Sequence, residues 1–215
     1  MTGTTASVPA KPLPNPDMTR TKPTPDLPGS ITIARHGRPD MDRKTRVDWR
    51  GYEDWWADYD RAGLAPEQAP PPELIAAGQE ARVIFASTLP RAIETAREAA
   101  PGREIVIDPV FVEAPLPPPT LPGQFPAHTW NVFARTAWWC GMARGQESRR
   151  QAELRAEAAA ARLIEAAQSG PVLLCAHGWF NRMMRPVLRS LGWRCVRDGG
   201  DYYWTHRRYE FRPDR

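Results

Sequence analysis

Short apolar runs alternate with longer amphipathic segments along the chain. Four of the runs predict buried strands, because they are continuous and bounded by polar or turn-forming residues. They lie at residues 31–34, 82–86, within 104–112, and at 171–176. Continuous apolar strands are typical of a largely parallel sheet that is covered by helices on both faces. The alternation of strands and helices predicts an α/β domain.

Four segments between and after these strands predict helices, at residues 73–81, 89–100, 147–168 and 180–191. The second has Pro90 in its first turn and ends before Pro101, which is typical punctuation of a helix. The third is rich in alanine, and we expect one buried side to carry Leu154, Ala158, Ala161 and Leu163 or Ile164. In the fourth, Pro186 should bend or divide the helix.

The chain divides into an arm and one domain. Residues 1–29 contain seven prolines and few large apolar side chains, which predicts a flexible arm. Residues 30–215 are expected to form a single domain. Within it, residues 115–126 hold six prolines and 128–142 are rich in aromatic residues. This insertion at about 115–142 is either a lid over a cleft or an aromatic addition to the core.

Composition narrows the class of protein. No apolar run is long enough to cross a membrane, and the N-terminus lacks the apolar core of a secretory signal. The three cysteines have no metal-binding or redox spacing, so we expect reduced thiols in the cytoplasm. Residues 185–215 hold eight arginines against four acidic residues. We interpret them as a solvated basic surface, since no nucleic-acid-binding motif accompanies them.

Two of the four histidines end apolar strands, and each is followed by glycine. They are His36 and His177. Ligands of α/β sheets bind at the carboxyl ends of strands, so two imidazoles delivered there can share one site. Arg35 precedes His36, and Arg91 lies in the first turn of a predicted helix, where anions are favoured. Taken alone, Arg91 would more simply form a surface ion pair with Glu94 or Glu98.

These motifs, taken in order, resemble the histidine phosphatase superfamily, the phosphoglycerate mutase-like proteins. The resemblance covers essentially residues 31–190. It rests on Arg35-His36-Gly37, on Ser87-Thr88-Leu89-Pro90-Arg91-Ala92-Ile93-Glu94-Thr95-Ala96, on Glu113, and on His177-Gly178. It implies a three-layer α/β/α sandwich around a mostly parallel sheet. It also implies phosphatase activity on a small phosphorylated compound or a phosphoprotein, with no metal or cofactor.

The resemblance also assigns roles to residues. His36 would attack phosphorus and become a phosphohistidine, which requires a neutral ring with one nitrogen fixed by a backbone carbonyl. Arg35, Arg91 and His177 would bind the phosphoryl oxygens. Glu113 would protonate the leaving oxygen and then activate water. No acidic residue occurs between Ala114 and Trp130, which favours Glu113 for this role.

The chain also departs from the family's pattern. Arg38 follows the tripeptide where Glu or Gln is common, and it is a candidate for substrate contact. Asp42 stands six residues after the nucleophile, where many members carry Asn, and cannot donate an amide hydrogen bond. The segment after Glu113 lacks the aromatic-glycine pattern of mutases. His128 and His206 match nothing in the family and are expected to be structural or surface residues.

These departures favour a phosphatase over a mutase. A mutase-like phosphotransferase and a non-catalytic phosphate-binding regulatory protein remain the alternatives. The substrate and the oligomeric state stay open.

Overall fold

A six-stranded sheet forms the centre of the protein in the computed structural model, which describes residues 27–212. The strand order is β4-β3-β6-β1-β8-β7, and the four strands β4, β3, β6 and β1 run parallel. The bounds are β1 (Ile31–Arg35), β3 (Val83–Ala86), β4 (Val106–Ile107), β6 (Val172–Ala176), β7 (Trp193–Asp198) and β8 (His206–Phe211). The mostly parallel α/β sheet is therefore confirmed. The predicted arm lies outside the described residues, apart from 27–29.

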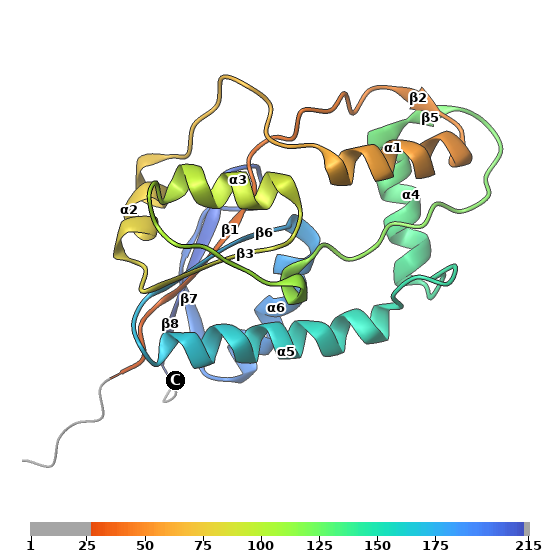
Figure 1. Ribbon diagram of the computed structural model, residues 1–215. Helices are drawn as coiled ribbons and strands as arrows, with labels where there is room; N and C mark the ends of the chain where they lie inside the picture. The colour runs from red at the N-terminus through yellow and green to blue at the C-terminus, as the bar shows by residue number, and fades with distance from the viewer. Residues whose placement is uncertain (1–26, 213–215) are drawn as a thin grey trace, which may run out of the picture.

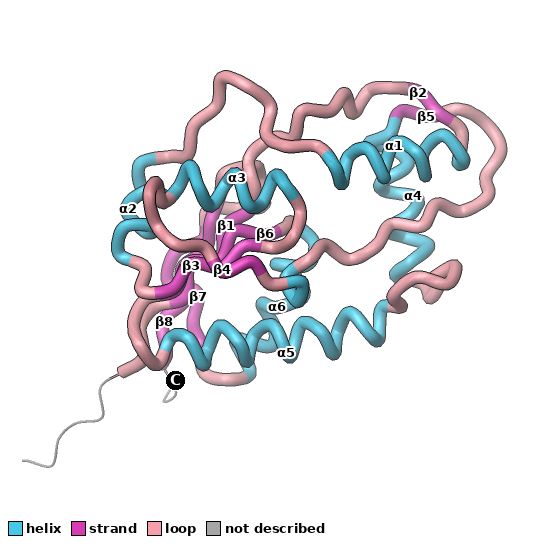
Figure 2. The backbone as a smooth tube through the Cα atoms, viewed as in Figure 1, coloured by secondary structure: helices cyan, strands magenta, loops and turns pink. Residues whose placement is uncertain are grey.

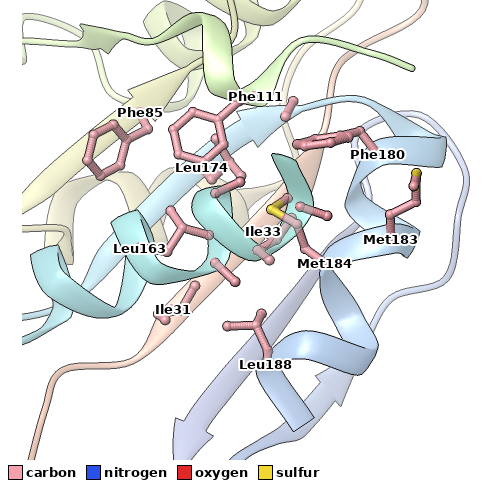
Figure 3. Close-up of a cluster of buried hydrophobic side chains, with 14 of the residues drawn as sticks. Ile31, Ile33, Phe85, Phe111, Leu163, Leu174, Phe180, Met183, Met184 and Leu188 are labelled. Atoms are coloured by element: carbon pink, nitrogen blue, oxygen red, sulfur yellow. The ribbon is translucent and has the colours of Figure 1, made fainter. Parts of the chain in front are cut away.

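Helices cover both faces of the sheet, which gives three layers (Figures 1 and 2). One face carries α2 (Pro72–Glu80) and α3 (Pro90–Ala99), and the other carries α5 (Arg149–Ala167) and α6 (Gly178–Ser190). Strand side chains alternate between the two layers. Ile31, Ile33 and Leu174 join the cluster under α5 and α6 (Figure 3), whereas Ala34 and Leu173 pack toward α2 and α3.

The predicted helices are confirmed in place, but the side of α5 that is buried was wrong in part. The buried side of α5 is formed by Ala152, Ala156, Ala159, Ala160, Leu163 and Ala167. Leu154 is half exposed, because the geometry of packing on the sheet, and not the size of this one side chain, sets which stripe of the helix faces inward. Pro186 lies inside α6 without dividing it. Pro186 is exposed, and the buried Met183, Met184 and Leu188 keep the helix docked through this position.

The predicted third strand is only two residues long, because a 3₁₀ helix, η1 (Pro109–Phe111), follows β4 at once. Asp108 caps η1 by accepting a hydrogen bond from the N–H of Val110. Phe111 is fully buried, and Glu113 follows two residues later. This turn directs the chain away from the sheet edge and toward the ends of β1 and β6.

A helical pair lies to one side of the sheet (Figure 1). It consists of α1 (Trp49–Arg61) and α4 (Ala127–Trp139), with a small ribbon of β2 (Arg46–Val47) and β5 (Phe125–Pro126). Helix α1 was not anticipated. An aromatic cluster joins the two helices, formed by Tyr52, Trp55, Tyr59, Leu116, Ala127, Trp130 and Ala134. The aromatic segment 128–142 thus builds a second core, which forms one wall of the cleft described below.

The basic C-terminal segment forms the hairpin β7–β8, and β8 pairs antiparallel with β1. Several arginines of this region form ion pairs, whereas the sequence predicted a solvated basic surface. Asp201, in the loop between the two strands, accepts hydrogen bonds from Arg182, Arg185 and Arg207. The loop, residues 199–205, also contacts the carboxyl end of β1, where the N–H of Arg35 donates to the carbonyl of Thr205. No helix within residues 27–212 is both long enough and apolar enough to cross a membrane.

Candidate active site

His36 and His177 lie side by side at the carboxyl ends of β1 and β6. Arg35 pairs in register with Ala176, so the residues that follow these two leave the sheet together. The N–H of His36 donates to the carbonyl of Ala176, and the two ring centroids are 5.2 Å apart. Both side chains are buried. The parallel pairing of two strands distant in sequence thus produces the shared site.

The environment of His36 favours a neutral ring. Its Nδ1 lies 2.7 Å from the carbonyl oxygen of Gly37, which fixes the proton on Nδ1 and leaves the Nε2 lone pair free. Burial, and then the nearby charges of Arg91 and Arg35, hold the pKa of His36 well below its usual range, against the raising effect of the Gly37 hydrogen bond. A neutral imidazole with a free Nε2 is the form that can act as a nucleophile.

The two buried histidines make stability depend on pH. Burial is also the main cause that lowers the pKa of His177. Below about pH 6.5 the unfolded chain therefore takes up protons that the folded chain does not, so stability falls as pH falls. We expect His36→Asn to reduce this dependence by up to one proton, about 1.4 kcal/mol per pH unit. Urea unfolding between pH 7.5 and 5.5 in phosphate-free buffer measures it, and an unchanged slope would contradict it.

Ser87 orients the second histidine. Its Oγ lies 2.5 Å from Nε2 of His177, and it also accepts a hydrogen bond from the N–H of Leu89 at the start of α3. When the Ser87 hydroxyl donates to Nε2 of a neutral ring, the proton of His177 resides on Nδ1. Nδ1 is buried and has no hydrogen-bond partner. In that tautomer, His177 carries an unused N–H donor on a ring that lies beside His36.

The side chain of Arg35 is positioned by contacts with the loop of residues 199–205. One of its terminal nitrogens donates to the carbonyl of Asp201 at 2.5 Å, and its guanidinium lies 4.4 Å from the centroid of the Tyr203 ring. Its Nε is buried without a partner. The guanidinium is thus fixed in position while keeping donor capacity for an anion.

Arg91 is one of the most deeply buried side chains, with 1% of its surface exposed. Its guanidinium donates to the carbonyl of Tyr59 at 2.7 Å and to Asp60 at 3.0 Å, both at the end of α1. The simpler alternative for Arg91, a surface ion pair with Glu94 or Glu98, is not what the structure has, since its carboxylate partner is Asp60. Glu94 instead accepts from the N–H of Leu64. Arg91 thus reaches across from α3 to α1, and its Nε remains unpartnered.

Glu113 lies at the amino-terminal end of α6. Its carboxylate accepts hydrogen bonds from the N–H groups of Trp179 and Phe180, at 3.1 and 2.8 Å, and from its neighbour Ala114. A helix N-terminus offers free N–H groups, and a carboxylate is a natural partner for them. This anchorage places Glu113 on the wall of the same cleft as His36.

Two glycines permit the close approach of these groups. A Cβ on Gly37 would lie 2.5 Å from the ring of Trp204, and one on Gly178 would lie 3.1 Å from Nε of Arg35. The N–H of Gly37 also donates to Thr95 of α3. The glycine after each histidine therefore leaves room for the C-terminal loop and for Arg35, respectively.

These residues surround a cleft of about 480 Å³. Its lining includes Arg35, His36, Arg91, Glu113 and Gly178, and we call this group, together with the buried His177, the deep site. The remaining lining comes from Arg43, Trp56, Tyr59, Leu116, His128, Asn131, Val132, Arg135, Thr136, Trp179, Arg182 and Asp201. Five buried side-chain nitrogens around the cleft have no hydrogen-bond partner. They belong to Arg35, Arg43, Arg91, His177 and Trp179.

Buried polar atoms without partners are rare, and their concentration here has a physical meaning. The four on the arginines and His177 are all donors, and an oxyanion between them would satisfy several at once. The arrangement is suited to binding a phosphoryl or similar anion beside Nε2 of His36. Within residues 27–212, no three or more His, Cys, Asp or Glu side chains gather as metal ligands would.

Some site residues were missed by sequence reasoning, and one candidate lies elsewhere. Arg38 is exposed and is not part of the cleft lining; its backbone N–H donates to Gln68. Arg43 and Tyr203 were not singled out, although both lie close to His36. His128 is exposed, as expected, yet it also lines the cleft. The only available signal for Arg43 was its short distance in sequence from His36.

The chain was also compared with known proteins. Residues 31–194 match the model of the histidine phosphatase superfamily, branch 1. A search of curated protein sequences finds no significant match. Among solved structures, a variant of phosphoserine phosphatase from Entamoeba histolytica in complex with phosphoserine is 14% identical, with a TM-score of 0.52 over 86% of this chain and 91% of that one.

Two further structures are similar. The same amoebal phosphatase in complex with 3-phosphoglyceric acid is 15% identical, with a TM-score of 0.50 over 75% of this chain and 80% of that one. A mycobacterial glucosyl-3-phosphoglycerate phosphatase is 21% identical, with a TM-score of 0.48 over 76% of this chain and 80% of that one. The family model covers most of the domain, including both histidines and both arginines of the deep site. The chain belongs to the histidine phosphatase superfamily.

Proposed function

We propose that the protein is a metal-independent phosphatase that hydrolyses a small phosphorylated compound through a phosphohistidine on His36. Family membership supports phosphatase chemistry in general. The observation that carries the proposal is the gathering of unpartnered buried donors around a neutral His36 with a free Nε2. Such a site binds a phosphoryl group and offers it a nucleophile.

The first step is the transfer of the phosphoryl group to the enzyme. Nε2 of His36 attacks phosphorus, the bond to the leaving oxygen breaks, and Glu113 supplies the proton that this oxygen needs. Arg35, Arg91 and His177 hold the phosphoryl oxygens. The donors are already fixed by Asp201, Tyr59, Asp60 and Ser87, so they require little reorganisation as charge develops.

The second step is hydrolysis of the phosphohistidine. Glu113, now deprotonated, takes a proton from water, and the resulting hydroxide attacks phosphorus. The P–N bond breaks, phosphate leaves, and His36 returns to its neutral state. The arginines supply the positive charge that offsets the developing negative charge of the phosphoryl group.

The three cysteines are free, and Cys175 is buried in the sheet, where burial raises the pKa of its thiol to about 12. A protonated, buried thiol behaves as a small apolar side chain. These features support our proposal that the protein works in a reducing compartment, the cytoplasm.

Hydrolysis of a generic aryl phosphate tests the proposed activity. We expect purified protein to release phosphate in the presence of excess EDTA at the same rate as without it. A rate that EDTA abolishes and a divalent cation restores would contradict the metal-independent step. Transfer of the phosphoryl group to a second substrate hydroxyl with little free phosphate would favour the mutase-like alternative. Binding of phosphate without any turnover would favour the regulatory one.

A further inference from the structure

Arg43 lies in the segment that joins β1 to β2, and hydrogen bonds connect this segment to the start of α4. The carbonyl oxygen of Arg43 accepts a hydrogen bond from the N–H of His128, and Nδ1 of His128 lies 3.1 Å from the same oxygen. The N–H of Ala127 donates to the carbonyl of Thr45. The backbone at Arg43 is thereby held at the amino-terminal end of α4, and its side chain lines the cleft with His36.

The guanidinium of Arg43 has spare donors. One terminal nitrogen donates to the hydroxyl of Tyr203 at 3.2 Å, and Nε is buried with no partner. Across residues 27–212, no carboxylate forms an ion pair with it. Two other cleft arginines differ, since Arg91 is paired with Asp60 and Arg182 with Asp201. A guanidinium left without a counter-ion beside a buried site favours a bound anion.

Tyr203 lies between Arg43 and two residues of the deep site, His36 and Arg35. Its ring centroid is 5.6 Å from that of His36, and the guanidinium of Arg35 lies over the same ring. Arg43 is also among the charges that act on His36, after burial, Arg91 and Arg35. The loop that carries Tyr203 follows residue 194, where the match to the family model ends. A segment outside that match thus contributes to the site.

The position before Arg43 does not supply this contact. Asp42 is exposed, and its carboxylate accepts hydrogen bonds from the N–H of Lys44 and the hydroxyl of Thr45. The side chain at 42 therefore caps its own turn. Arg43 is the residue of this segment that faces the cleft together with His36.

We propose that Arg43 is a third arginine of the phosphoryl site, which donates to an oxygen of the bound anion and is positioned there by the hydroxyl of Tyr203. The proposal rests on the proposed function in one respect, namely that the anion in the cleft is phosphoryl. The Tyr203 hydroxyl orients one side of the guanidinium, and Nε–H with the remaining terminal N–H groups is left for the ligand.

Binding of inorganic phosphate and of orthovanadate, measured by calorimetry on the full chain, tests the proposal without relying on turnover. We expect Arg43→Met to weaken both anions about 10- to 100-fold, as expected for a charge-assisted hydrogen bond. Arg43→Lys keeps the positive charge but loses the forked guanidinium. Its affinity for both anions should lie between those of wild type and Arg43→Met. Arg46→Met is the matched control, because Arg46 is exposed on β2 and bonds to Gln124 outside the cleft. It should bind as wild type does.

The part of Tyr203 is tested by a double-mutant cycle. Tyr203→Phe removes only the hydroxyl and keeps the ring against Arg35 and His36. We expect it to weaken phosphate binding several-fold in the wild-type background and to have no effect in Arg43→Met. Tyr202→Phe is the control, since Tyr202 is 81% exposed on the same loop. The thermal midpoint of each variant separates lost binding from lost folding.

Wild-type affinity in Arg43→Met, or an equal loss in Arg46→Met, would overturn the assignment of Arg43. An equal effect of Tyr203→Phe in both backgrounds would overturn its positioning role. If wild-type protein binds phosphate through Arg43 but hydrolyses no phosphate ester, the proposed phosphatase fails while this inference stands. If it hydrolyses esters and Arg43→Met has normal kcat/KM and affinity, the inference fails alone.

Discussion

His36→Ala is expected to lower kcat for aryl phosphate hydrolysis by at least about 10³-fold, because it removes the proposed nucleophile and with it the proposed two-step route. The loss corresponds to about 4 kcal/mol or more of transition-state stabilisation. The arginines and His177 remain, so the variant should still bind inorganic phosphate. It should do so at least as tightly as wild type does, since a bulky neighbour of the anion has been removed. Steady-state kinetics and calorimetry measure the two quantities.

The intermediate itself provides the decisive measurement. Rapid quenching of wild-type protein during turnover should trap a phosphoryl group that is labile in acid and stable in base, as expected for a P–N bond. Peptide mapping should locate it at His36. His128→Ala is the control, since His128 is an exposed histidine of the same cleft. It should retain the label at His36. Labelling of any other residue, or a kcat of His36→Ala within tenfold of wild type, would refute the assignment of His36 as the nucleophile.

The layers of the fold could be predicted because they depend on local patterns. The strands β1 and β6 are continuous apolar runs, and Pro90 marks the first turn of α3. Helix α1 was missed because its sequence is polar on average. The aromatic spacing of Tyr52, Trp55 and Tyr59 was the available signal, since three, four and seven residues separate them along one helical face.

The C-terminal hairpin shows the limit of such patterns. Strand β8 reads His206-Arg207-Arg208-Tyr209-Glu210-Phe211, with little of the apolar character expected of a strand inside a sheet. It is stabilised by pairing with β1 and by the ion pairs of Arg207 with Asp198 and Asp201. These partners become visible only when the chain is folded, so the segment was interpreted as a solvated surface.

The residues of the deep site could be predicted from the sequence, but their hydrogen-bond partners could not. His36, Arg91 and His177 were identified from their places at strand and helix ends. The protein partners of Arg91 were not predicted: they are Tyr59 and Asp60, about 30 positions earlier, whereas the local alternative named only Glu94 and Glu98. The contact of Arg43 with Tyr203 spans 160 positions. Periodicity carries no information about contacts at such separations.

Glu113→Gln is expected to reduce kcat/KM in a way that depends on the leaving group. For an alkyl phosphate, whose leaving oxygen needs a proton, we expect a loss of about 10²- to 10⁴-fold. For an aryl phosphate with an acidic phenol, the loss should be about tenfold or less, because the phenolate departs without help. This parameter reports steps up to the first irreversible one, which in the proposed mechanism is formation of the phosphohistidine. In the proposed mechanism, breakdown of the intermediate also needs Glu113, so the aryl substrate should give a burst followed by slow turnover.

The same variant disturbs structure, and the leaving-group comparison separates that effect from proton transfer. The Glu113 carboxylate accepts from Trp179 and Phe180 at the start of α6, and glutamine has one oxygen fewer to do so. A displaced α6 would move Gly178 and His177 and would slow both substrates alike. A loss confined to the alkyl phosphate therefore identifies Glu113 as the acid. An equal loss for the alkyl and the aryl phosphate, with no burst, would indicate that Glu113 only anchors the start of α6. Another group would then protonate the leaving oxygen.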